Sequence, residues 1–229
     1  MSLINGGVRG HEVADELWRK DERGFILSHA DAIDYEKVLD CGGSNGSYSA
    51  SLFVSPRGRL YVVDTKTPSK TGKHVNFVKG DIRHLPFRDN TFDIVFARSV
   101  LHHVPNEFGA SVSELHRVTK QNGLCIVSEP LSTWFGRVLR RIQSTYHDPG
   151  EQPCTYDELF TSLSLVFPCG TGKGFGVFAP WLSYLSFYVW IPKCFIRALH
   201  YFDRWLIKNG FYTLVYQMVW IMEKHDKEG

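Results

Sequence analysis

The sequence predicts an α/β protein built around a mostly parallel, doubly wound sheet. Short and almost purely apolar runs recur through the first half of the chain, at residues 60–63, 75–78, 92–97 and 124–128. Strands that are apolar at consecutive positions indicate a sheet covered on both faces. Helical patterns alternate with these runs, and that alternation is typical of parallel sheets.

The predicted helices follow from apolar residues at helical spacing. Residues 11–33 predict one helix, in which a set of apolar side chains stands among polar neighbours: Val13, Leu17, Phe25 and Ile26. A short strand around Val38-Leu39 ends at Gly42-Gly43, and residues 47–54 then predict a second helix. A third lies between the last two apolar runs. Its apolar residues follow an i, i+4, i+7 pattern and precede a stop at Asn122-Gly123: Phe108, Val112 and Leu115.

The composition changes after Pro130. Residues 131–165 predict mixed, mainly helical structure, whereas residues 174–192 carry no charge and many aromatic side chains. A transmembrane helix needs roughly 20 uninterrupted apolar residues, and two prolines interrupt this run. We therefore expect a buried or interfacial aromatic helix there rather than a membrane span. The last apolar stretch, Tyr212 to Met222, predicts a closing strand.

Composition limits the classes of protein that the chain can represent. Its 229 residues, 43% hydrophobic and 22% charged, predict one folded domain, and a net charge of +2 gives no reason to expect a nucleic-acid partner. Five cysteines without a C-x-x-C pair, and an N-terminus without a signal-peptide core, predict a cytoplasmic protein. We expect no metal site, because the chain has neither an H-E-x-x-H motif nor a cysteine cluster.

The residues that end the predicted strands form a candidate ligand site. Open parallel sheets bind ligands outside the carboxyl ends of their strands. The first strand ends at Asp40 and a glycine-rich turn, residues 42–46, before a helix N-terminus whose free N–H groups suit a carboxylate. Asp64 ends the second strand, 22 residues after Gly42, where an acidic side chain can accept both hydroxyls of a ribose.

Two further strands end in candidate ligand-binding residues. Asp81-Ile82 ends the third strand and combines a polar acceptor with an apolar wall, as an adenine ring requires. Ala97-Arg98-Ser99 ends the fourth and leads into His102-His103. A nicotinamide dinucleotide is disfavoured as the ligand, because a G-x-G-x-x-G motif would need glycine where the chain has Ser44 and Ser47. No P-loop motif occurs.

Five segments, in order along residues 36–130, resemble motifs of class I methyltransferases that act on small molecules, the family that includes the ubiquinone and menaquinone biosynthetic enzymes. The segments are Val-Leu-Asp-Cys-Gly-Gly-Ser-Asn-Gly, Tyr-Val-Val-Asp, Gly-Asp-Ile-Arg-His-Leu-Pro-Phe, Phe-Asp-Ile-Val-Phe-Ala-Arg-Ser-Val-Leu-His-His-Val and Glu-Leu-His-Arg-Val-Thr-Lys-Gln-Asn-Gly. The chain departs from the family motifs at Ser44, where the first motif has a glycine, and at Gln121, where the late turn has a proline.

The resemblance implies a Rossmann-like sheet of seven strands with a helical lid, in which residues 212–222 form an antiparallel strand. It implies a single domain over residues 1–229, with a cofactor-binding core at 36–130 and a variable, substrate-covering lid at 131–211. The implied cofactor is S-adenosyl-L-methionine. The implied cofactor-binding residues are Asp40, Gly42, Gly43, Gly46, Asp64, Thr65, Asp81, Ile82 and Arg98.

The implied reaction is methyl transfer to an O, N or C atom of a small acceptor, for which lipophilic and lipid- or saccharide-linked molecules are candidates. If the acceptor needs a general base, His147 and His103 are the candidates. Tyr146 and Trp134 are candidates for contacting the substrate, and residues 175–190 for contacting a membrane surface.

Two other classes of function stay open at this point. The chain could bind the cofactor and serve as a non-catalytic partner or regulatory subunit. A nucleic-acid methyltransferase would instead carry a target-base motif such as Asn-Pro-Pro-Tyr after the fourth strand, and this chain has Ala97-Arg98-Ser99-Val100 there.

Overall fold

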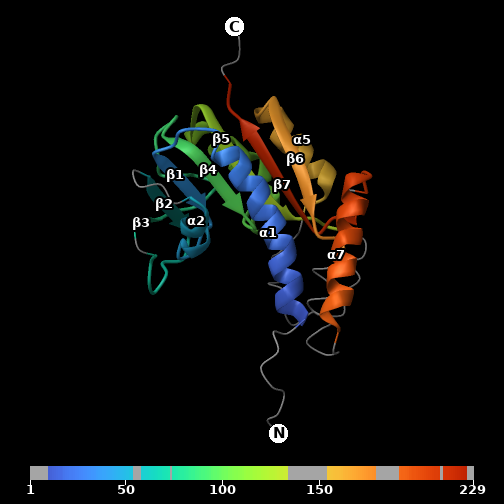
Figure 1. The fold of residues 1–229 in the computed structure, drawn as a ribbon. Helices are drawn as coiled ribbons and strands as arrows, with labels where there is room; N and C mark the ends of the chain where they lie inside the picture. The colour runs from blue at the N-terminus through green and yellow to red at the C-terminus, as the bar shows by residue number, and fades with distance from the viewer. Residues whose placement is uncertain are drawn as a thin grey trace.

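The computed structural model describes residues 10–53, 58–72, 74–133, 154–178, 191–211 and 214–225. A twisted sheet of seven strands runs through the molecule with helices against both of its faces (Figure 1). The strands are β1 (Lys37–Cys41), β2 (Arg59–Asp64), β3 (Val75–Lys79), β4 (Phe92–Arg98), β5 (Thr119–Pro130), β6 (Cys169–Phe175) and β7 (Gln217–Glu223).

The strand order is β3-β2-β1-β4-β5-β7-β6. The pairs from β3 through to β5 are parallel, whereas β7 runs antiparallel to both β5 and β6. The chain therefore moves outward from β1 to β3, returns, and continues on the other side of β1 with β4. This confirms the predicted mostly parallel seven-stranded sheet and the antiparallel closing strand, although β7 covers only the second part of residues 212–222.

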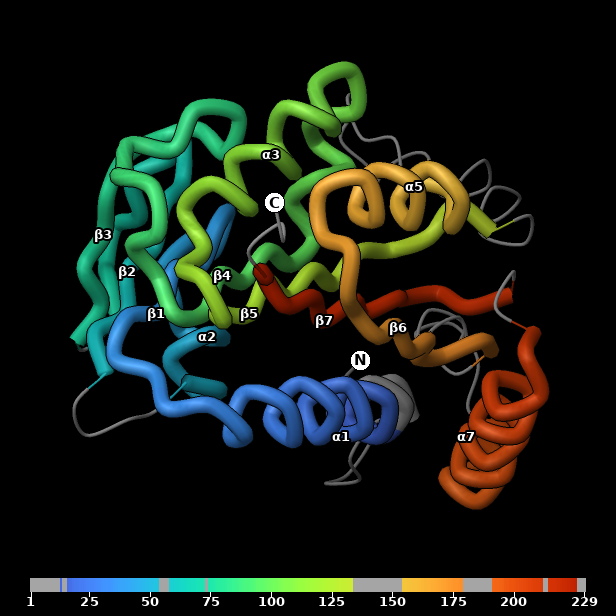
Figure 2. The backbone as a smooth tube through the Cα atoms, turned by 90° about the horizontal axis from the view of Figure 1, so that it is seen from above, coloured from blue at the N-terminus to red at the C-terminus, as the bar shows by residue number. Residues whose placement is uncertain are grey.

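Helices cover the two faces of the sheet separately (Figure 2). One face carries α1 (Gly10–Ala30) and the short α2 (Ser47–Leu52), with α7 (Lys193–Lys208) beside α1 at the far corner. The other face carries α3 (Phe108–Val118) and α5 (Tyr156–Val166). Two single-turn 3-10 helices, η1 (Leu101–His103) and η2 (Pro105–Glu107), connect β4 to α3.

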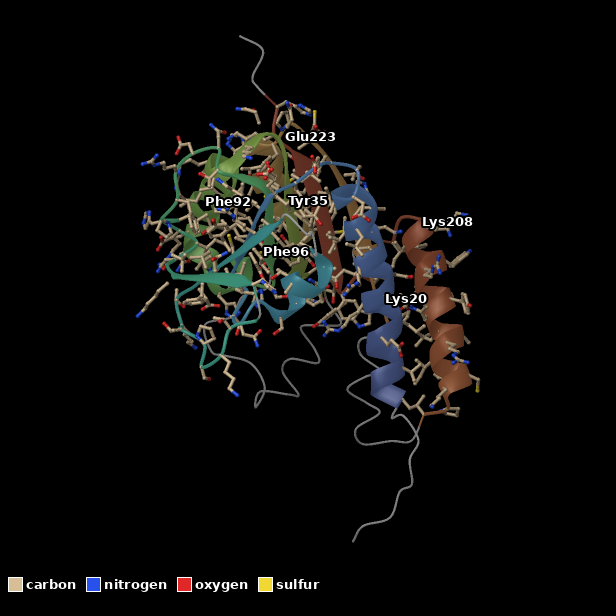
Figure 3. All side chains as sticks on the ribbon, turned by 60° about the vertical axis from the view of Figure 1, so that its left-hand side comes forward. Lys20, Tyr35, Phe92, Phe96, Lys208 and Glu223 are labelled. Atoms are coloured by element: carbon tan, nitrogen blue, oxygen red, sulfur yellow. The ribbon has the colours of Figure 1, made fainter. Side chains whose placement is uncertain are left out.

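The alternation of side chains along the strands creates two apolar cores. On β4, Ile94 and Phe96 are buried against α1 and α2, whereas Val95 and Ala97 are buried against α3 and α5. The ring of Phe96, labelled in Figure 3, packs against Tyr48 and Phe53 at α2, with centroids 6.2 and 5.5 Å away. Because both faces of the strand are covered, four consecutive apolar residues can all be buried, which explains the unbroken apolar runs of the sequence.

The second half of the chain differs from its predicted structure. Helix α5 confirms only part of the helical structure expected over 131–165, because residues 134–153 lie outside the described part of the chain. The aromatic helix expected over 174–192 is wrong at its start, where Phe175 closes β6, and residues 179–190 lie outside the described part. From the sequence, no residues were assigned to strand β6 or to helix α7.

The first half follows its prediction more closely, although α1 ends at Ala30 rather than at residue 33 and α2 at Leu52 rather than at residue 54. Helix α3 ends at Val118 rather than at Asn122-Gly123, and β5 begins directly at Thr119. At this end the backbone N–H of Thr119 donates to the carbonyl of Leu115, and its hydroxyl donates to the same carbonyl at 2.7 Å. Within the residues that the structure describes, no helix is both long and apolar enough to cross a membrane.

Candidate functional site

The exits of β1 and β4 meet at the point where the strand order reverses. Cys41 and Ala97 are paired at the carboxyl ends of these adjacent strands, so the segments that follow them lie side by side. Such a switch point is where open α/β sheets form their ligand crevice. Gly42 has a φ of 72°, and a Cβ there would come within 2.8 Å of Cβ of Val100 in the β4 exit. Glycine thus allows the two exits to approach closely.

The carboxylate of Asp40 lies directly beneath the glycine-rich loop. The residue is 3% exposed, and a Cβ at Gly43 would overlap its carboxylate oxygens. Burial raises the pKa of Asp40 to about 6, although Ser49 and the Arg98 guanidinium act to lower it. The loop therefore rests on a carboxyl group that changes its charge in the mildly acidic range.

Asp40→Asn should make the fold more stable at neutral pH. Because the pKa of Asp40 is raised from 3.8 to about 6, its contribution to stability is full below about pH 4 and is lost as the pH rises through 6. A shift of this size corresponds to at most about 3 kcal/mol, at about 1.4 kcal/mol for each pH unit. Urea unfolding across this range should show the free energy of unfolding falling in the wild type and falling less in the variant. The control is Asp34→Asn, because Asp34 is exposed. If the free energy of unfolding falls equally with pH in the wild type and in Asp40→Asn, the raised pKa is wrongly assigned to Asp40.

Asp64 joins the end of β2 to the loop after β1. One carboxylate oxygen accepts the N–H of Ser44 at 3.0 Å, and the other accepts the N–H of Lys66 at 2.9 Å. Asp64 is half-buried. A carboxylate has about four acceptor positions, so the two backbone bonds leave acceptor capacity at the rim of the crevice. Asp64 thus lies beside the glycine-rich loop, and its role in binding a cofactor stays a prediction.

Ser44 occupies the position where the sequence departs from the family motif. Its φ is 52°, in the left-handed region that favours glycine. Ser44→Gly should therefore raise the free energy of unfolding by about 1 kcal/mol while keeping the N–H that Asp64 accepts. The same change at Ser47, in the first turn of α2, serves as the control and should bring no gain. A loss of stability in thermal or urea unfolding of Ser44→Gly would show that its side chain is needed there.

Asp81 follows β3, and its carboxylate accepts hydrogen bonds from Arg83. The backbone N–H and Nε of Arg83 donate to Oδ1 at 2.9 Å each, and Nη2 lies 2.6 Å from Oδ2. The hydrogen bonds from Arg83 lower the pKa of Asp81. Ile82 is 6% exposed and packs in the core with Val63 and Leu85. The expected apolar wall is therefore largely buried at this position.

The side chain of Arg98 turns toward the helices on one face of the sheet. Its guanidinium carbon lies 4.5 Å from the ring centroid of Tyr48, and Nη2 lies 3.4 Å from Oε2 of Glu22 in α1. Glu22 is fully buried and accepts the Ser128 hydroxyl at 2.6 Å. This carboxylate holds α1 against the carboxyl ends of β4 and β5. Sequence reasoning missed Glu22, because one acid among the several of an amphipathic helix resembles a solvent-facing residue.

A second buried carboxylate, Glu129, shapes the exit of β4. Its Oε1 accepts the N–H groups of Val100 and Leu101 at 2.7 and 2.8 Å, and its Oε2 lies 2.7 Å from Nδ1 of His102. Glu129 is fully buried at the end of β5. The sequence did carry a signal for it, because an acid ending an apolar strand is the pattern that singled out Asp64.

Gly46 is the N-cap residue of α2, with a φ of 72°, and the other remaining predicted residues divide into two groups. Thr65 and His103 are exposed, the former directly after β2 and the latter in η1, with its ring centroid 4.2 Å from that of His102. His147, Tyr146 and Trp134 lie outside the residues that the structure describes. No group of three or more His, Cys, Asp or Glu side chains able to hold a metal ion occurs within the described ranges.

Comparisons with known proteins agree with this geometry. Residues 39–127 match the family model described as a methyltransferase domain. Demethylmenaquinone methyltransferase of Geobacillus stearothermophilus is 30% identical over 132 residues, which cover 52% of this chain and 54% of that protein. The chain thus spans about half the length of the curated relatives it matches.

Solved structures share the fold at low sequence identity. A SAM-dependent methyltransferase from Archaeoglobus fulgidus superposes with a TM-score of 0.58 at 17% identity, covering 88% of this chain and 94% of that one. Geranyl diphosphate methyltransferase in complex with SAM gives a TM-score of 0.60 at 9% identity, covering 89% and 84%. The fold is that of the class I methyltransferases, and the resemblance predicted from the five segments is confirmed.

Proposed function

We propose that this chain is an S-adenosylmethionine-dependent methyltransferase. The observation that carries the proposal is that the exits of β1 and β4 meet at the switch point, where open α/β sheets form their ligand crevice. There Asp64 accepts an N–H of the glycine-rich loop, and that loop rests on the buried carboxyl of Asp40. The methyltransferase-domain match over residues 39–127 includes all of these groups. In this proposal residues 36–130 bind the cofactor and residues 131–211 cover the acceptor.

The residues of the crevice suit the parts of S-adenosylmethionine. The free acceptor positions of Asp64 would receive the ribose hydroxyls, and residues 42–46 would lie along the methionyl portion. Asp81 would lie nearest the adenine, with its carboxylate held in place by Arg83. When bound, the sulfonium supplies an activated methyl group, and the protein contributes mainly orientation and exclusion of water, which together are worth roughly 7–11 kcal/mol.

We propose a small lipophilic molecule as the methyl acceptor. The relatives at about 30% identity include enzymes named for demethylmenaquinone, and the chain carries an uncharged aromatic stretch at residues 175–190. Aromatic side chains are typical walls of pockets for apolar ligands. For an acceptor that must lose a proton, His103 and His147 remain the candidate bases. The Glu129 carboxylate beside His102 would fix the orientation of that neighbouring ring.

The test is methyl transfer by the purified full chain, measured with methyl-labelled cofactor and a panel of acceptors. The panel should contain hydroxylated quinol rings with and without a prenyl tail, simple amines and short oligonucleotides. Transfer to the prenylated quinols supports both the activity and the acceptor class. Transfer only to oligonucleotides contradicts the acceptor class, and cofactor binding without transfer to any acceptor favours the non-catalytic alternative.

A further inference from the structure

Helix α7 presents an apolar face that the described part of the molecule does not cover. Its buried side chains, Ile196, His200, Asp203 and Leu206, point back to the rest of the protein. On the outer side Tyr201 is 68% exposed and Trp205 is 55% exposed, with Phe195 and Phe202 close to half exposed. Six of the eight exposed large hydrophobic residues in the described ranges lie between positions 195 and 214.

The charges of α7 are all positive on its exposed surface. The four exposed basic residues, Lys193, Arg197, Arg204 and Lys208, fall within an arc of about 60° at 3.6 residues per turn. This basic stripe borders the aromatic one. The single acid of the helix, Asp203, is buried and accepts the N–H groups of Val177 and Phe178 at 2.9 and 3.0 Å. The outer face is therefore cationic and aromatic.

A groove of about 820 Å³ lies between α7, α1 and the edge strand β6, and Arg204 and Lys208 of the basic stripe line it. Lys20 on α1 and Lys208 at the end of the neighbouring α7 both line this groove, and Figure 3 labels them. Lys173 from β6 and Arg204 add two more cations. The acid facing them from α1 is Asp21, which lies 3.6 Å from Nε of Arg204 and 3.3 Å from Nε2 of His200. The groove is thus lined by four cations and by two acids, Asp21 and the buried Asp203.

We infer that α7 and this groove form a docking surface for an anionic lipid bilayer. Aromatic side chains prefer the interface between headgroups and acyl chains, and lysine and arginine beside them attract anionic lipids. Here the aromatic stripe would enter that interface while the basic stripe and the groove receive the headgroup phosphates. In Figure 2 the helix lies at an outer corner, which a flat surface can reach. The uncharged aromatic residues 179–190 precede it in the sequence.

The inference concerns α7 itself rather than the residues 175–190 expected from the sequence, and it stands independently of the proposed methyl transfer. Aromatic exposure alone would suit a protein partner equally well. Helix α7 carries four exposed cations and no exposed acid. This favours an anionic bilayer over a protein partner, because binding to such a bilayer depends on positive charge and weakens with salt.

Vesicle flotation with the full chain tests this surface. Vesicles of phosphatidylcholine alone should bind it weakly, and vesicles containing phosphatidylglycerol should bind it in low salt and release it in high salt. Arg197→Gln with Lys208→Gln should weaken binding at least tenfold, since each cation near the surface contributes about a fivefold factor. Tyr201→Ala with Trp205→Ala should weaken it as well. Two controls should bind like the wild type: Arg59→Gln with Arg88→Gln, and Phe160→Ala with Leu165→Ala on α5.

Three outcomes would overturn the inference. The first is the absence of binding to phosphatidylglycerol vesicles in low salt. The second is equal binding by the wild type and the α7 charge variant, with circular dichroism showing that both are folded. The third is a stable dimer in sedimentation that Trp205→Ala dissociates, because the aromatic stripe would then be covered by a second copy of the chain.

Discussion

Replacing Asp64 by alanine should weaken binding of S-adenosylmethionine by about 10- to 100-fold. The carboxylate is expected to receive both ribose hydroxyls, and hydrogen bonds to a charged acceptor contribute about 1.5–3 kcal/mol. It also accepts the N–H groups of Ser44 and Lys66, so its loss frees the loop that should contact the methionyl portion. Calorimetric titration measures the change directly.

Asp34→Ala provides the matched control for Asp64→Ala. Asp34 is an exposed acid between α1 and β1, at the opposite end of the strands from the crevice, so its removal should leave the affinity unchanged. Asp64→Asn separates the two roles of the carboxylate, because the amide keeps one acceptor oxygen for the loop and loses the charge. Full affinity in Asp64→Ala would remove Asp64 from the cofactor site.

Glu129→Ala should lower the free energy of unfolding by about 3–5 kcal/mol, the range for breaking a buried charged partner. The fully buried carboxylate accepts two backbone N–H groups and lies 2.7 Å from His102. Without it, the N–H groups of Val100 and Leu101 lose their partner, and an unsatisfied buried donor costs about 1–3 kcal/mol. Because Val100 packs against Gly42, the crevice should loosen too. Urea unfolding measures the loss.

Glu129→Gln distinguishes hydrogen bonding from charge. The amide oxygen can still accept both N–H groups, so this variant should lose much less stability than Glu129→Ala. Equal losses in the two variants would mean that the negative charge beside His102, and not the bonds to the β4 exit, is what the fold requires. Thr161→Ala, on the surface of α5, should leave the stability nearly unchanged.

The parallel half of the sheet could be predicted because each strand carries its own signal. Strands β2 and β4 are bounded apolar runs, and their burial on both faces of the sheet produces that pattern within each strand. Strand β6 carries no such signal, since Gly170, Gly172 and Gly174 alternate along it. Cβ atoms at Gly170 and Gly172 would come within about 3 Å of the side chains of Met222 and Met218 on β7. The glycines are thus explained by a distant strand, which local patterns do not reveal.

The candidate site was predictable only where its residues end strands. Asp40, Gly42 and Asp64 end strands, and the rule that ligands bind at strand ends brings them together without coordinates. Glu22 could not be found this way, because its role depends on contacts with Ser128 and Arg98, which follow it by 106 and 76 residues. Arg98 was expected at the crevice, but the direction of its side chain follows from those same long-range contacts.

The central claim is that the crevice between the exits of β1 and β4 binds S-adenosylmethionine. Calorimetric titration of the full chain with this cofactor tests it most directly. The wild type should bind one S-adenosylmethionine per chain, and Asp64→Ala should bind it at least tenfold more weakly, while circular dichroism shows both proteins folded. A folded wild-type chain that releases no heat and shows no retention of labelled cofactor in equilibrium dialysis would show that the crevice does not bind S-adenosylmethionine.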